Sequence, residues 1–174
     1  MATKHLRKSN RRRRKLAKIN LEESTRPAAG LRRLFTDPAS ISSGWAYYVG
    51  KTLKSHGTIR ADKSWPVFAR LHVIWAGYRN LVVDGSVDEV HIEQLPRMCH
   101  HFTHWSVGVI GHACHKFTSA IESDIPVKSW QKFVGWDGKQ GDKFAKEGPE
   151  PLKQPESEDE RAAIAMGWYW VNRK

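Results

Sequence analysis

Two acidic residues stand at the ends of apolar runs, and their positions predict a metal site. Asp37 follows the run that begins at Leu34, and Glu93 ends the run that begins at Val90. Carboxylates at the ends of inner strands can hold a divalent cation, with room for a phosphate beside it. Each acid alone has an ordinary explanation, Asp37 as part of an Asp-Pro turn and Glu93 as a strand-end charge. The two acids as a pair favour the metal site.

A further group of acids opens the last helix that the sequence predicts. Ser157 and Glu160 have the spacing of a capping box, and the apolar body Ala162–Val171 follows. If this helix packs on the sheet, its first turn brings Asp159 beside the other two acids. Alternatively, Asp159 is only a favourable charge at a helix N-terminus. Three carboxylates from separated segments suit two Mg²⁺ ions, which activate a water and stabilise the leaving oxygen in phosphodiester cleavage.

The elements that must position these acids follow from the hydrophobic pattern. Three strands, a helix, a strand, a helix, a strand, a long loop and a last helix predict an α/β fold, a mixed five-stranded sheet with helices on both faces. Small residues from Pro38 to Gly44 are expected to turn the chain, and Gly135–Pro155 is expected to be a mobile loop. The expected strands are Leu31–Thr36, Gly44–Leu53, Ser55–Arg60, Val87–Glu93 and Ile121–Val127, and the expected earlier helices run from the N-cap Ser64 to Leu81, over Cys99–Phe117 and over Trp130–Val134.

The charge of the chain is concentrated at its N-terminus. The net charge is +11, and residues 1–33 hold 12 of the 29 basic side chains but only two of the 18 acidic ones. This segment includes Arg11, Arg12, Arg13 and Arg14. Such a block repels itself, so residues 1–30 are expected to form a disordered basic arm that binds a polyphosphate by counterion release. A solubilising or targeting tail is the alternative.

Residues 31–174 are expected to form one folded domain. The 40% hydrophobic content of the chain supports a core of its own. No run approaches the ~20 apolar residues that span a bilayer, and no apolar stretch follows the basic start, so neither a membrane partner nor a secretory signal is expected. Cys99 and Cys114 are too few for a disulfide framework and fit a reducing, intracellular compartment.

Lysines and tryptophans near the long loop are candidate DNA contacts. Lys128, Lys132, Lys139 and Lys143 lie in or beside that loop. They are expected to hold phosphates, while a solvated loop is the alternative. Trp130 and Trp136 are candidates for stacking on unpaired bases, although Trp130 also fits a core position.

Five histidines and both cysteines lie between residues 99 and 117, which raises the question of zinc. Their spacing fits no compact zinc module, and ligands on one continuous helix cannot all converge. Histidines on a helix face or in a dimer seam are the simpler interpretation. Gly108 and Gly111, with the apolar residues between them, predict a smooth surface that can pair with a second copy.

The motifs resemble those of RuvC-like Holliday-junction resolvases of the ribonuclease H-like superfamily, especially the phage-type members. The matching segments are Phe35–Ser40 with Gly44–Ala46, Ile92–Gln94, Pro126–Gly135, and Ser157–Glu160 with Ala163–Gly167. The resemblance covers roughly residues 31–170. It implies a ribonuclease H-like domain and a homodimeric endonuclease that nicks branched DNA in symmetric pairs. It also implies dependence on Mg²⁺, with Mn²⁺ as a substitute, no small-molecule cofactor, and a place in bacterial or phage-infected host cytoplasm.

By this resemblance Asp37 and Glu93 are metal ligands, but the last helix departs from the family pattern. Family members usually carry two metal-binding positions three residues apart on it. If Asp159 is the first, the second falls on Ala162, which cannot bind a metal. We expect Asp159 to act with Glu158; Glu160 and Glu156 are further substitutes. The alternatives are a non-catalytic protein that binds branched DNA and a ribonuclease H-like nuclease that cuts RNA–DNA hybrids.

Overall fold

The computed structural model describes residues 30–83, 86–96, 99, 101–118, 120–136, 150, 155 and 157–173. Residues from Leu31 onward belong to one compact unit. The predicted basic arm, including Arg11, Arg12, Arg13 and Arg14, lies outside the described residues, as does almost all of the long loop after Trp136.

Five strands form one mixed sheet, as the sequence predicts, in the order β3-β2-β1-β4-β5. Neighbours β1 and β2 are antiparallel, as are β2 and β3, whereas β4 runs parallel to both β1 and β5. The strands are β1 Arg32–Asp37, β2 Ser42–Val49, β3 Thr52–Arg60, β4 Glu89–Gln94 and β5 Ala120–Pro126. The helices are α2 Val67–Val82, α3 His101–Cys114, α4 Val127–Val134 and α6 Glu158–Asn172.

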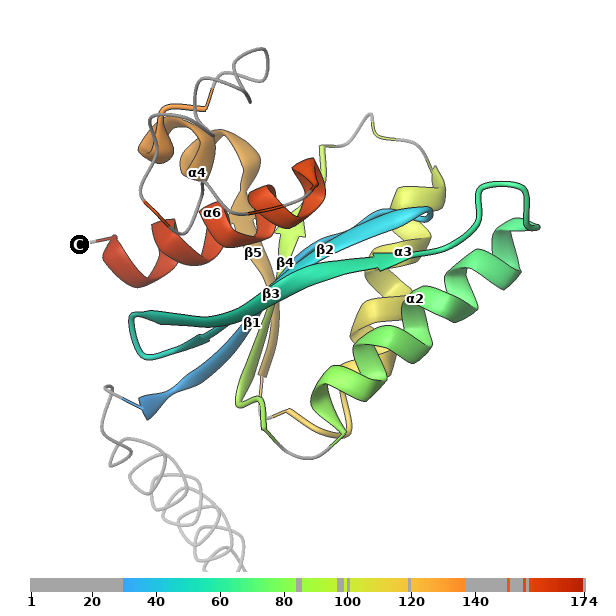
Figure 1. Cartoon of the computed structure of the whole chain (residues 1–174), viewed down its shortest axis with the longest axis horizontal. Coiled ribbons are helices and arrows are strands. Elements are labelled where there is room, and N and C mark those ends of the chain that lie inside the picture. The colour runs from blue at the N-terminus through green and yellow to red at the C-terminus, as the bar shows by residue number, and fades with distance from the viewer. Residues whose placement is uncertain are drawn as a thin grey trace, which may run out of the picture. The chain divides into compact units, whose positions relative to one another are not determined.

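Helices cover both faces of the sheet (Figure 1). Neighbouring residues of β1 point to opposite faces: Phe35 packs in the cluster with α6 and α4, and Leu34 packs in the cluster with α2 and α3. Helix α6 lies close on β1 and β2, since a Cβ on its Gly167 would come within 2.2 Å of the Tyr48 ring. The face that carries Phe35 is therefore also the face on which α6 can approach Asp37.

Several element boundaries differ from the predicted ones for local reasons. The hairpin turns at Gly50 rather than near Lys54, because Gly50 takes a left-handed φ of 59° that suits glycine. Gly44, expected in a turn, lies inside β2. Ser64 is not the N-cap of α2: Pro66 holds that position, and the Ser64 hydroxyl donates to Asp62.

Helices α3 and α4 also begin at other residues than predicted. Helix α4 starts at Val127, directly after Pro126, rather than at Trp130. Helix α3 is shorter at both ends than the predicted Cys99–Phe117. Within the described residues, no helix combines the length and the apolar character that crossing a membrane requires.

Candidate metal centre

The sheet places Asp37 and Glu93 side by side. Strands β1 and β4 are parallel neighbours, and Thr36 pairs with Ile92, so the two acids occupy the next position of the register. Both lie at the carboxyl ends of their strands and on the face that α6 covers. Glu93 is buried, with 8% of its surface exposed. Two acids are thus held together by the backbone of the sheet rather than by flexible loops.

Electrostatics at this pair disfavour two negative charges. Burial, followed by the charges of Glu93 and Asp159, raises the pKa of Asp37 well above its ordinary value, and its hydrogen bond with Glu93 acts in the same direction. Burial also raises the pKa of Glu93, while hydrogen bonds from Trp130 and Asp37 oppose the rise. Two negative charges at this pair are therefore unfavourable without a nearby cation, and a divalent cation would balance both.

A close helix–strand contact brings the first turn of α6 to the same edge. Gly44 on β2 pairs with Asp37 across the sheet. A Cβ on Gly44 would lie 1.9 Å from the backbone oxygen of Asp159, so only glycine permits this approach. The approach puts Asp159 near enough for its charge to raise the pKa of Asp37, and Glu158 contributes in the same sense.

Half of the capping box predicted for α6 is confirmed: Ser157 is the N-cap, but the Glu160 carboxylate has another partner. The Ser157 hydroxyl accepts from the Glu160 backbone N–H at 3.2 Å. The Glu160 carboxylate pairs with Nδ1 of His56 on β3, and the Ser157 hydroxyl lies 2.7 Å from that of Thr58. Glu160 is therefore turned to β3 and is not available as a substitute ligand.

The remaining candidates for the third ligand differ in position. Asp159 is half-buried and Glu158 is exposed, while Ala162 is buried and Glu156 lies outside the described residues. Within the part of the chain that the structure describes, no three His, Cys, Asp or Glu side chains are arranged to hold a metal ion. Asp159 and Glu158 are thus neighbours of the pair rather than members of a formed site, and their role as ligands stays a prediction.

The donor set of the pair itself fits Mg²⁺. This ion prefers oxygen ligands and is usually held by one or two carboxylates together with water and substrate phosphates. Asp37 and Glu93 supply two adjacent carboxylates, and the burial that raises the pKa of each favours a bound cation over two bare charges. One cation suits this pair, and a second requires the acids of α6.

Trp130 contacts the pair, a contact that sequence reasoning missed. Its Nε1 donates to Oε1 of Glu93 at 2.9 Å, and the residue is 2% exposed. This burial confirms the interpretation of Trp130 as a core residue. Trp136 is also buried and meets Trp130 edge-on at 5.3 Å. The expectation that the Trp136 ring stacks on unpaired bases is therefore wrong, because it presents no face to solvent.

Two of the four candidate lysines fall on described residues. Lys128 and Lys132 are exposed on α4, four residues apart and so on one side of the helix. Trp130, between them in sequence, points into the core. Lys139 and Lys143 lie outside the described residues.

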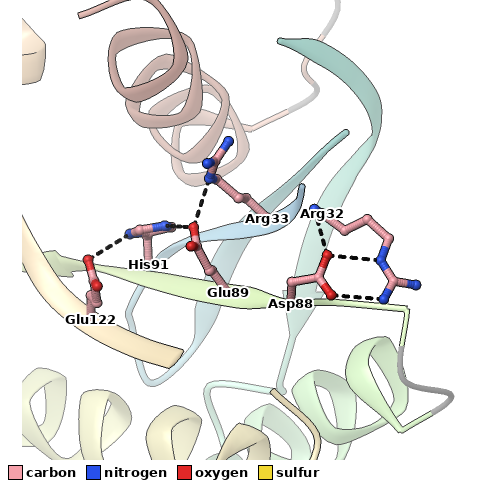
Figure 2. Close-up of polar contacts among 6 residues, drawn as sticks. All are labelled: Arg32, Arg33, Asp88, Glu89, His91 and Glu122. Atoms are coloured by element: carbon pink, nitrogen blue, oxygen red, sulfur yellow. Dashed lines mark hydrogen bonds and ion pairs between the residues drawn. The ribbon is translucent and has the colours of Figure 1, made fainter. Parts of the chain in front are cut away.

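A second group of charges lies at the opposite ends of β1 and β4 (Figure 2). The Arg32 side chain donates to both carboxylate oxygens of Asp88, at 3.1 and 2.9 Å, and its backbone N–H donates to Asp88 as well. The Arg33 Nε donates to Glu89 at 2.8 Å, and Nε2 of His91 lies 3.2 Å from the same oxygen. Asp88 and Glu89 each have an arginine partner, whereas Glu122 faces His91.

The fold of this chain is similar to that of solved structures. The structure of Thermus thermophilus RuvC matches with a TM-score of 0.59 and 12% identity, over 80% of this chain and 92% of that one. T. thermophilus RuvC in complex with a Holliday junction substrate matches with a TM-score of 0.60 and 12% identity, over 80% and 91%.

The fold is RuvC-like. The predicted ribonuclease H-like class is therefore confirmed. No protein-family model and no curated protein matches the sequence. At 12% identity the RuvC-like fold is what the likeness establishes, and the phage-type subgroup stays a prediction.

Proposed function

We propose that the chain is a metal-dependent endonuclease that resolves Holliday junctions, and other branched DNA, by paired symmetric nicks. The observation that carries this proposal is the Asp37–Glu93 pair at the carboxyl edge of the sheet, in which Glu93 is buried and Asp37 half-buried. The likeness to RuvC supports it, since one of the matching structures holds a Holliday junction substrate. The resulting class is a crossover junction endodeoxyribonuclease, a phosphodiester hydrolase.

The proposed chemistry assigns a task to each group at the site. Asp37 and Glu93 would hold Mg²⁺, with Asp159 and then Glu158 recruited by the small movement that a second cation requires. When bound, the metal supplies an activated water and stabilises the leaving oxygen. The chain itself orients the carboxylates, because β1, β4 and α6 bury Glu93 and leave Asp37 half-buried.

Basic side chains would hold the DNA around this site. Lys128 and Lys132 project from α4, which follows β5 directly, and each can bind a backbone phosphate. We propose the same role for Lys139 and Lys143. The arginines at positions 11–14 would add sequence-independent affinity for the arms of the junction.

We also propose that the outer face of α2 and α3 is where two copies meet. An open groove between these helices is lined by Phe68, Leu71, His72, Trp75, His104, Trp105, Gly108, Val109 and His112. Phe68 is 72% exposed and Trp105 43%, and their rings stack at 5.7 Å. Among the described residues, no lysine, arginine or carboxylate lines the groove, which suits a self-complementary apolar interface. Two copies would provide the two active sites that paired nicks need.

Sedimentation tests this interface. The wild-type protein should sediment as a dimer and Trp105→Asp as a monomer, and a monomeric wild type would contradict the assignment.

A second candidate is a non-catalytic protein that binds branched DNA. The observation in its favour is Ala162, a buried methyl group one turn after Asp159, where the resemblance implies another ligand. Loss of that ligand would weaken the second metal without disturbing the fold.

The deciding experiment compares four-way-junction, linear-duplex and RNA–DNA-hybrid substrates of equal length, each with Mg²⁺ and with Mn²⁺. Symmetric nicks on the junction alone would support the resolvase. Tight junction binding without nicks under both metals would support the binding protein, and cleavage of the hybrid alone would support a ribonuclease H-like activity. Asp37→Asn serves as the control for contaminating nucleases.

A further inference from the structure

We propose that Trp130 is a positioning residue for the cation site, whose indole N–H fixes the Glu93 carboxylate in the orientation that binds the metal. The inference rests on the proposed metal site, and it goes beyond that site by assigning a role to a tryptophan that does not itself bind the ion.

The bond is placed where its loss would matter. Both partners are buried, Trp130 at 2% and Glu93 at 8% exposure, and the Nε1–Oε1 distance is 2.9 Å. A buried N–H that loses its acceptor is costly, so the bond is kept in the folded state. It engages Oε1 and so limits rotation of the carboxylate, which also meets the Asp37 side chain. Glu93 therefore meets the ion already oriented.

The indole is itself prevented from rotating. The Trp136 ring packs edge-on against it, and the backbone N–H of Trp136 donates to the carbonyl of Gln131 at 2.7 Å, which closes the end of α4. Gly135 makes this closure possible with a left-handed φ of 74°. Strand β4 thus supplies the ligand, and α4 supplies the group that holds it, a typical arrangement of an outer hydrogen-bond partner around a metal ligand.

Two matched substitutions separate orientation from packing. Trp130→Phe and Trp136→Phe each remove one buried indole from the same cluster, but only Trp130→Phe removes the bond to Glu93. Mg²⁺ binding is measured without DNA, by following the indole ¹H–¹⁵N signals of the eight tryptophans during a titration. We expect Trp130→Phe to weaken Mg²⁺ binding by about 10- to 100-fold. Trp136→Phe keeps the bond to Glu93 and a ring beside the indole, so it should weaken Mg²⁺ binding far less. The wild-type signal that Trp130→Phe removes should be the one that moves most on adding Mg²⁺.

Equal Mg²⁺ affinity in the two variants, or a Trp130 signal that ignores Mg²⁺, would overturn the inference. If Trp130→Phe does not fold, Glu93→Gln identifies the Trp130 signal from the acceptor side, and the wild-type titration decides. The same experiments test the proposed nuclease separately. Mg²⁺ binding that depends on Trp130, without junction cleavage, would contradict the nuclease and support the role of Trp130. Junction cleavage, with Mg²⁺ binding that does not depend on Trp130, would support the nuclease and contradict the role of Trp130.

Discussion

The two ends of β1 and β4 carry similar residues in opposite electrostatic situations. At the amino ends, Asp88 and Glu89 are paired with Arg32 and Arg33 (Figure 2). At the carboxyl ends, Asp37 faces Glu93, and among the described residues no ion pair joins either acid to a lysine or arginine. The same two strands thus hold one balanced group of charges and one unbalanced pair.

The pKa directions follow this difference. A hydrogen bond from His91, followed by the Arg33 side chain, lowers the pKa of Glu89 despite partial burial. Burial and neighbouring acids raise the pKa of Asp37. The acids at the amino ends thus have a counter-charge within the chain, whereas the pair at the carboxyl ends is the one that a bound cation would stabilise.

The largest expected effect is the loss of cleavage in Asp37→Asn. An amide is a poor ligand for Mg²⁺, and the several kcal/mol of transition-state stabilisation that a metal supplies correspond to a rate loss on the order of 10³-fold. Single-turnover nicking of a four-way junction measures it, with gel-shift assays to show that binding is retained.

Asp88→Asn is the matched control for that substitution, since it neutralises a buried acid at the other end of the same strand pair. It should cleave at the wild-type rate well below its melting temperature. If Asp37→Asn and Asp88→Asn lose cleavage activity equally, cleavage depends on buried charge at either end of the strands. The proposed difference between the two ends would then be wrong.

The next effect concerns the approach of α6. Gly44→Ala places a methyl group 1.9 Å from the Asp159 backbone oxygen, so the helix must move away from β2. We expect a loss of about 3 kcal/mol in the free energy of unfolding, at the upper end of overpacking costs, together with reduced cleavage. Urea unfolding and the junction assay measure the two effects. Gly30→Ala is the control, because its added Cβ meets nothing within 4 Å and the residue lies outside the proposed interface of α2 and α3.

The adjacency of Asp37 and Glu93 was predictable from the sequence. Each acid ends an apolar run, and the order of elements makes those runs central parallel strands. The confirmed fold class follows from the same periodicity, whereas the metal role of the pair stays a prediction.

The remaining contacts depend on tertiary packing that no local pattern encodes. The sequence predicts Gly44 as a turn residue, and only the structure shows that α6 packs directly against it. The sequence also predicts Trp130 as a core residue, but it does not predict the hydrogen bond from its indole N–H to Glu93. Glu160 has two sequence explanations, as a capping partner or as a metal ligand, but its carboxylate pairs with His56, which neither explanation predicts. Side-chain direction across the sheet is thus the part that the sequence leaves open.

A smaller effect is expected at the balanced end. Asp88→Asn removes the charge that holds the Arg32 guanidinium and weakens three hydrogen bonds, so the free energy of unfolding should fall by about 2 kcal/mol. Urea unfolding checks this, with the fully exposed Asp62→Asn as a control that should change little. Unchanged stability in Asp88→Asn would mean that the arginine pairs do not stabilise the sheet.

The smallest expected effect is a gain in the free energy of unfolding, in Asp37→Asn without metal. Because the folded state raises the pKa of Asp37, the unfolded chain loses this proton first as pH rises above about 4, and the wild type loses stability up to the higher folded-state pKa. The amide that replaces the carboxyl group does not titrate, so the variant should be slightly more stable than the wild type at pH 7 in EDTA, and the difference should vanish near pH 3. Mg²⁺ should stabilise the wild type at pH 7, by about 1.4 kcal/mol at ten times its dissociation constant, and should do much less for the variant. A variant that is less stable than the wild type in EDTA would show that the carboxylate pair is satisfied without a cation, as the acids at the amino ends are.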